Sequence, residues 1–262
     1  MPKLLHDTAT VFSREITPEL RSPVSIVLAM GQPLLFLVLF GSMLVGTEAG
    51  SEAGLGAGTG AGTGDVWQWF VPGILVMMCL MGPLSAGHSM LKELAGGQME
   101  RFLVTPVSRT SLILGRTAKD TATLFAQAVL ITAVAIPLGM ELHLTGVLAA
   151  MVLLIVMAVG LSALSYILAI ASLPSGNLFW MVTQMLVFPL TLLSGILLPV
   201  DTAPGWLSTA AMVNPVTYVV DAARALFAGD FLDVSVLHGA LAATVIATIG
   251  PALSARAMKR GL

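Results

Sequence analysis

The sequence predicts an all-α membrane protein with six transmembrane helices. Hydrophobic residues make up 56% of the 262 residues and charged residues only 10%, whereas a soluble domain has about 25% charged residues. There is therefore too little polar surface to cover a water-soluble globule. The apolar residues also form continuous runs long enough to cross a hydrocarbon core of ~30 Å, rather than the alternating pattern of barrel strands. Both observations favour a bundle of spanning helices.

The segment before the first apolar run predicts an N-terminal amphipathic helix. Within residues 1–23, apolar side chains recur at roughly helical spacing beside charged ones, which suits a helix lying in the membrane interface. A short solvated tail is the alternative. The first run is longer than the 7–15 apolar residues of a secretory signal, so we expect it to be retained. The six predicted spans are about 24–45, 70–89, 121–138, 146–169, 178–200 and 236–253.

The distribution of Lys and Arg predicts the topology. Basic residues in short loops stay on the cytoplasmic side during insertion. Placing both termini in the cytoplasm puts eleven of the twelve basic residues inside, and only Arg224 outside. The inside group comprises Lys3, Arg14, Arg21, Lys92, Arg101, Arg109, Arg116, Lys119, Arg256, Lys259 and Arg260.

The cytoplasmic loop 90–120 concentrates charge in an otherwise apolar chain. It contains the stretch QMERFLVTPVSRTSLILGR, which begins at Gln98. Gly96-Gly97 and Thr105-Pro106 break helical structure on either side of a short segment. We interpret the loop as a short charged helix and turn that docks on a soluble partner. Its basic residues would also be expected if they only fixed the topology.

The outer segment 201–235 is unusually apolar for a loop. Asn214-Pro215 reads as a helix cap with Pro at the first helical position. The helix that follows is too short and too polar at Asp221 and Arg224 to span, and these two residues are spaced to pair. We predict a re-entrant helical hairpin, with an interfacial helix lying flat as the alternative.

Two function classes find no support in the sequence. Ion-coupled transporters carry titratable residues within their spans, and the middle of the six predicted spans has none. The chain also lacks a Walker A sequence and the HExxH, CxxC and GxSxG motifs, so we expect no cofactor to bind to it. Uphill transport would need a partner that supplies energy. Four polar residues lie in or beside the spans, and we expect them to contact neighbouring helices rather than the substrate. They are Gln32, Gln127, Asn177 and Gln184.

Three motifs resemble the permease subunits of ABC-2 type transporters, especially the daunorubicin-resistance-type drug exporters. The stretch GGQMERFLVTPVSRTSLILGRTAKD resembles the signature loop of that family. A second stretch, LLSGILLPVDTAPGWLSTAAMVNPVTYVVDAARALF, resembles the outer signature after the fifth helix. WFVPGILVMMCL resembles the start of the second helix. With six spans and inside termini, the similarity covers nearly the whole chain.

The resemblance implies a fold, partners and roles for individual residues. Such a permease pairs with a second permease copy and with two separate ATPase subunits, which bind ATP and Mg²⁺, in the bacterial inner membrane. Residues 1–23 would be a connecting helix and the region around Glu100 a coupling helix. The implied coupling residues are Glu93, Glu100, Arg101, Thr105, Pro106 and Arg109. The implied pathway or gate residues, along the second and fifth helices and the outer hairpin, are Met77, Met78, Met81, Gln184, Phe188, Asn214, Pro215 and Tyr218.

Several other functions remain open at this point. The cargo is expected to be a hydrophobic or amphipathic small molecule such as a drug or lipid, and a lipid-linked glycan is an alternative. A facilitative channel would need no ATP, and an immunity protein would transport nothing. An intramembrane enzyme would need a cluster of titratable residues, for which Glu141 and His143 form the one candidate pair. Nothing predicts binding to nucleic acid.

Overall fold

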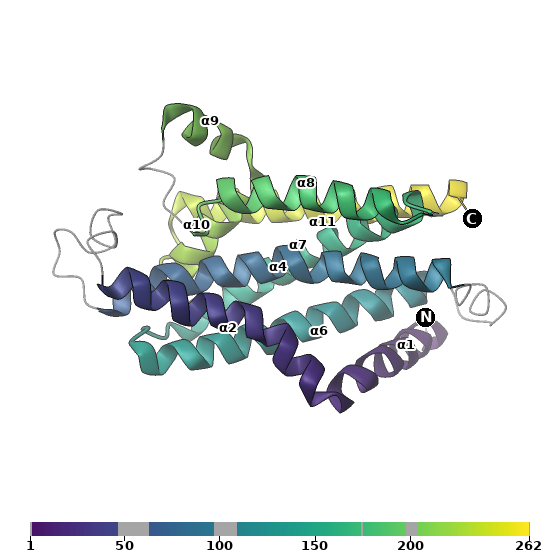
Figure 1. The fold of residues 1–262 in the computed structure, drawn as a ribbon, viewed down its shortest axis with the longest axis horizontal. Coiled ribbons are helices and arrows are strands. Elements are labelled where there is room, and N and C mark those ends of the chain that lie inside the picture. Colours follow the sequence, from purple (N-terminus) through teal and green to yellow (C-terminus); the bar gives the residue numbers. More distant parts are fainter. Residues whose placement is uncertain (1, 47–62, 97–108, 174, 198–203, 262) are drawn as a thin grey trace.

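The computed structural model describes residues 2–46, 63–96, 109–173, 175–197 and 204–261, and these residues form helices and turns without any strand. Figure 1 shows long helices running along one axis, with both ends of the chain at the same end of the bundle. That arrangement agrees with termini on one side of a membrane. The predicted docking residues Glu100, Arg101, Thr105 and Pro106 lie outside the described residues.

Four helices of the described chain are long and apolar enough to cross a membrane. They are the segments Val66–Glu93, Leu114–Leu138, Leu144–Ala171 and Val234–Ser254. They correspond to the second, third, fourth and sixth predicted spans. The third segment starts seven residues before its predicted start at residue 121 and so includes Arg116 and Asp120.

The first and fifth predicted spans lie on helices whose described apolar parts are shorter, Met30–Gly41 and Asn177–Leu193. In full, α2 runs Pro23–Gly46 and α8 runs Asn177–Leu193. Gly195, which has a left-handed φ of 73°, follows the end of α8. The count of six spans therefore stays a prediction.

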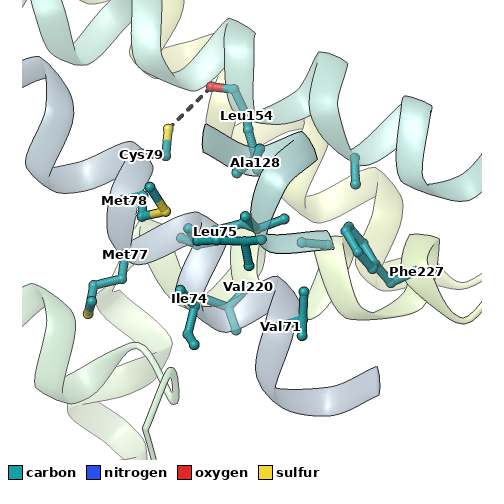
Figure 2. Close-up of a cluster of buried hydrophobic side chains, with 14 of the residues drawn as sticks. Val71, Ile74, Leu75, Met77, Met78, Cys79, Ala128, Leu154, Val220 and Phe227 are labelled. Carbon is teal, nitrogen blue, oxygen red and sulfur yellow. Dashed lines mark hydrogen bonds between the residues drawn. The ribbon is translucent and has the colours of Figure 1, made fainter. Parts of the chain in front are cut away.

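Helices α4 (Thr63–Ala95) and α7 (Leu144–Ala171) form the centre of the bundle. Figure 2 shows how buried side chains from α4 meet Ala128 of α6 (Arg109–Ala135), Leu154 of α7 and Val220 of α10 (Pro215–Phe227). The thiol of Cys79 donates to the carbonyl oxygen of Leu154, 3.2 Å away. Burial of these apolar side chains from four helices makes one continuous core.

The remaining elements lie around this core. α11 (Val234–Gly261) packs along α7 and α10. A 3₁₀ turn, Ile136–Leu138, ends α6. α9 (Gly205–Val213) precedes α10 and stands away from the bundle in Figure 1.

Asp233 precedes α11 and accepts from the backbone N–H of Ser235 at 2.8 Å, which holds the pKa of this exposed carboxyl below its ordinary value.

The N-terminal segment is a helix, as predicted, and it packs against the protein. α1 (Pro2–Arg21) lies along the first half of α6. A side chain at Gly115 of α6 would lie 2.7 Å from Val11 of α1, so glycine is what permits this close approach. Ser22 separates α1 from α2, and the two helices meet at a sharp bend in Figure 1.

Helices α7 and α11 cross closely at two glycines. A β-carbon at Gly160 would lie 2.4 Å from the carbonyl oxygen of Ile246, and one at Gly250 would lie 2.3 Å from the carbonyl oxygen of Gly160. These contacts are with rigid backbone atoms, so the helices would have to separate to admit a side chain. Small residues at such crossings are what membrane helices use to pack closely.

We expect Gly160→Ala to destabilise the protein by ~1–3 kcal/mol, since the added methyl group would push α11 away. The matched control is Gly31→Ala, because nothing lies within 4 Å of a β-carbon at Gly31. Thermal unfolding in detergent, followed by tryptophan fluorescence, should give a lower midpoint for Gly160→Ala alone. Equal midpoints for the two variants would contradict the close crossing.

Candidate functional site

A buried cation joins three helices where α4 ends and α6 begins. The side chain of Arg116, on α6, is only 8% exposed. Its guanidinium forms an ion pair with Glu93, near the end of α4. It also lies 3.6 Å from a carboxylate oxygen of Glu15 on α1. A buried charge needs such partners, because an unpaired one would cost several kcal/mol.

The position of this ion pair matters for the predicted docking segment. Glu93 precedes residues 97–108 by one helical turn, and Arg116 follows them by about two turns. The pair therefore joins α4 and α6, the two helices that flank that segment in the sequence. The contact with Glu15 adds α1 to the same unit. We call Glu15, Glu93 and Arg116 the inner ion cluster.

A second polar contact lies one turn further along α6. The hydroxyl of Tyr166, on α7, donates to Asp120 at 3.1 Å, and Tyr166 is 1% exposed. The ammonium of Lys119 lies 3.4 Å from the other carboxylate oxygen of Asp120. These contacts extend the polar connections from α1, α4 and α6 to α7.

These polar residues line a cavity of about 380 Å³ between α1, α2, α4, α6 and α7. The lining also includes Met77, Met78 and Met81 of α4 and Leu124 of α6, together with polar residues such as Gln127. The first two methionines are buried and Met81 is exposed. A cavity lined by both apolar side chains and polar groups has the composition of a small-molecule site.

The motif Asn214-Pro215-Val216-Thr217-Tyr218 has a clear structural role at the opposite end of the bundle. Asn214 caps α10, as predicted, by accepting from the N–H of Val216 at 3.0 Å. Its amide also donates to the carbonyl oxygen of Leu190 at 2.8 Å. Thr217 donates to the carbonyl of Leu193 or of Ala211, which lie 3.2 and 3.0 Å away. These carbonyls belong to the last turns of α8 and α9, and that of Ala211 also accepts from the backbone N–H of Asn214 at 3.1 Å.

Tyr218 acts in the same way toward α9. Its hydroxyl donates to the carbonyl oxygen of Met212 at 2.7 Å. Pro215 occupies the first position of α10, where its missing N–H costs nothing. The motif therefore ties α10 to the ends of α8 and α9. The sequence predicted the cap but not the other three contacts.

Arg224 fixes α10 to two further helices. Its guanidinium lies 3.8 Å from the ring centroid of Trp69, near the start of α4, in a cation–π contact. It donates to the carbonyl oxygens of Trp69, at 3.2 Å, and Gly195, at 2.8 Å. The predicted pair with Asp221 is present at 3.8 Å. One cation therefore holds α4, α10 and the turn after α8 together.

The other predicted pathway residues lie apart from the inner cavity. Gln184 and Phe188 are exposed on α8, where Phe188 is 72% accessible. Such a face would contact lipid or another chain. Arg109 is the first residue of α6. The methionines are thus the part of the predicted pathway that lines a cavity in the described residues.

The candidate pair for an intramembrane enzyme does not form a cluster. Glu141 and His143 are both exposed in the turn before α7. His143 Nδ1 lies 3.2 Å from the carbonyl oxygen of Phe227, which places the ring in a structural contact. No group of three metal-ligating side chains occurs in the part of the chain that the structure describes.

Comparisons with known proteins agree with this architecture. A family model described as ABC-2 type transporter matches residues 6–228. A protein of Cyanophora paradoxa named as the transport permease ycf38 is 28% identical over 79% of this chain and 69% of its own length. The daunorubicin resistance ABC transporter permease protein DrrB1 of Streptomyces coeruleorubidus is 25% identical over 87% and 78%. A protein of Escherichia coli K12 named as the multidrug ABC transporter permease YbhR is 26% identical over 63% and 45%.

We expect Arg224→Ala to loosen the contact between α10, α4 and the turn after α8, because it removes the cation–π contact and both carbonyl bonds. Hydrogen exchange of peptides covering 191–197 and 215–228 should speed up by about tenfold or more. Arg256→Ala is the control, since Arg256 is exposed on α11. Unchanged exchange in Arg224→Ala would contradict this role.

Proposed function

Since this chain belongs to the ABC-2 type transporter family, we propose that it is the membrane-spanning permease subunit of an ATP-driven exporter of a hydrophobic or amphipathic small molecule. Permeases of this family are transporter components without their own ATPase site, and they work with an ABC ATPase. The chain is accordingly a multi-pass membrane protein.

The finer parts of the proposal concern assembly and placement. Two permease copies would pair with two ATPase subunits, and the ATPases would bind ATP and Mg²⁺. The chain would cross a bacterial inner membrane six times, with both termini in the cytoplasm. The basic residues of the sequence support this orientation, and the position of both ends at one end of the bundle fits it.

The inner ion cluster is the observation that carries the proposed mechanism. Residues 97–108 connect α4 to α6 along the chain. The Glu93–Arg116 pair joins these two helices at positions close in sequence to that segment. A push on that segment would therefore move both helices together instead of being absorbed between them. The proposed roles of Glu100, Arg101, Thr105 and Pro106 in docking fit this position.

We derive the transport step from this linkage. ATP-driven closure of the partner subunits would push the docking segment toward the membrane. α4 and α6 would tilt as a unit, carrying α1 with them through Glu15. At the far end, the start of α4 contacts Arg224 of α10 through Trp69. A tilt of α4 would therefore reach the predicted outer gate, where the pathway would open outward.

The proposed cargo class has two supports. Two relatives are named for resistance to daunorubicin and for multidrug transport. The cavity beside α4 presents methionines, whose flexible side chains adapt to different apolar surfaces. Both favour a small molecule over a long hydrophilic polymer.

The test is transport by the complex of this chain with its ATPase, reconstituted in vesicles. We expect Glu93→Gln to lower ATP-dependent transport at least tenfold, because Arg116 loses its main partner and the two helices can move independently. The complex should still assemble, since the docking segment is unchanged. Lys92→Gln, at the exposed neighbouring position, is the control.

A charge exchange separates coupling from loss of the side chain itself. Glu93→Arg combined with Arg116→Glu restores an ion pair with its polarity reversed. Recovery of a substantial part of transport in the double variant would support the link. Full transport in Glu93→Gln, or transport without any ATPase, would overturn the proposed function.

A further inference from the structure

The cavity between α1, α2, α4, α6 and α7 has two ends that differ in depth and in chemistry. The ionisable residues that line it are Glu15, Glu93, Arg116, Lys119 and Asp120. Met81 lies twelve residues before Glu93 on α4, and Gln127 lies eleven residues after Arg116 on α6. At the helical rise of 1.5 Å per residue, both are about 16–18 Å along their helices from the inner ion cluster. We call the part of the cavity lined by Gln32, Met77, Met78, Met81, Leu124 and Gln127 the deep end.

The deep end has no ionisable side chain among its described lining residues. It also lies far from either membrane surface, because Met81 is close to the middle of the apolar segment Val66–Glu93. A charged group at this depth would lose its hydration without meeting an opposite charge. The deep end therefore disfavours both cations and anions.

Two side-chain amides of the deep end have no hydrogen-bond partner among the described residues. They are Gln32 on α2 and Gln127 on α6. Both lie within apolar helical segments, Met30–Gly41 and Leu114–Leu138, where the surrounding lipid offers no hydrogen-bond partner. The sequence predicts contacts with neighbouring helices for these residues, whereas the structure places both on the cavity wall. Each amide can therefore donate to, and accept from, a molecule in the cavity.

The rest of the deep end sets the apolar part of the ligand. Met77, Met78 and Met81 of α4 lie on this wall, with Leu124 of α6. Methionine side chains are flexible and polarisable, so they adapt to apolar surfaces of different shape. A purely apolar molecule would leave the amides unpaired, which has a free-energy cost in a site shielded from water. A ligand that satisfies the whole wall needs an apolar body and an uncharged polar group.

We propose that the deep end binds an uncharged molecule with an apolar body and a group, such as a carboxamide, that both donates and accepts hydrogen bonds. Gln32 and Gln127 supply the polar contacts, and the three methionines contact the apolar body. This inference rests on the proposed function, because it names the chemical class of the cargo. Binding concerns the permease alone, so it can be measured without an ATPase.

The experiment measures the binding of three radiolabelled probes to the purified chain in lipid nanodiscs. They are naphthalene-2-carboxamide, the carboxamidine and the carboxylate, which have nearly the same shape and are neutral, cationic and anionic at neutral pH. Partitioning into empty nanodiscs is subtracted from each measurement. We expect saturable binding of the carboxamide at one site per chain, and only nonsaturable partitioning of the two charged probes.

Substitution of the amides locates the site. Gln127→Leu should weaken binding of the carboxamide by about three- to tenfold, which is the contribution of one hydrogen bond. Gln32→Leu should have a similar effect, and it keeps the test valid if Gln127→Leu does not fold. The matched control is Asn177→Leu, which removes an exposed amide at the start of α8 that does not line the cavity.

Three results would overturn the site. They are the absence of saturable carboxamide binding, equally tight binding of either charged probe, and unchanged affinity in both glutamine variants. If the carboxamide binds as expected while vesicle transport does not depend on ATP, the proposed function fails and the site stands. If ATP-driven transport occurs while the carboxamide does not bind, the site fails and the proposed function stands.

Discussion

The arrangement of this molecule depends on the buried guanidinium of Arg116. A charge in so apolar a bundle is tolerated only when carboxylates hold it, and those carboxylates come from two other helices. The requirement to pair Arg116 therefore fixes α1, α4 and α6 relative to one another. It does so beside the segment proposed to receive the push of an ATPase. The same electrostatic requirement shapes both the fold and the proposed coupling.

A comparable set of contacts, made by Arg224, stabilises the opposite end of the bundle. Arg224 binds two backbone carbonyls and an indole ring, and so joins α4, α10 and the turn after α8. Between the two arginines, α4 contributes many of the buried apolar side chains of the core. α4 thus connects a polar cluster at one end with a polar junction at the other. We regard it as the element through which motion at one end would reach the other, and it also carries three methionines that line the cavity.

Local signals in the sequence predicted much of the fold. The fourth span, predicted as 146–169, is the helix Leu144–Ala171, since an apolar run of this length favours a membrane helix. Asn214-Pro215 identified a helix start, since capping is a local interaction. The contact of Arg116 with Glu93 and Glu15 could not be predicted, because it joins residues far apart in sequence and no periodicity signals it. The third span is predicted to begin at residue 121, whereas residues 109–120 are helical as well and Arg116 is buried. The contacts of Thr217, Tyr218 and Arg224 with carbonyls of other helices could not be predicted for the same reason, because no local pattern indicates them.

The most direct test of the account is a distance measurement by electron–electron resonance between spin labels on α1 and α6, at the exposed positions Ala9 and Ala118. Labelled chains would be diluted with unlabelled ones in the complex with the ATPase, and the buried Cys79 should not react with the label. We expect the same α1–α6 distance in the nucleotide-free and ATP-bound states, while the distance from Ala118 to the exposed Met181 of α8 changes. A shift of the α1–α6 distance between the two states, with Arg116 intact, would contradict the claim that the inner ion cluster moves as one unit.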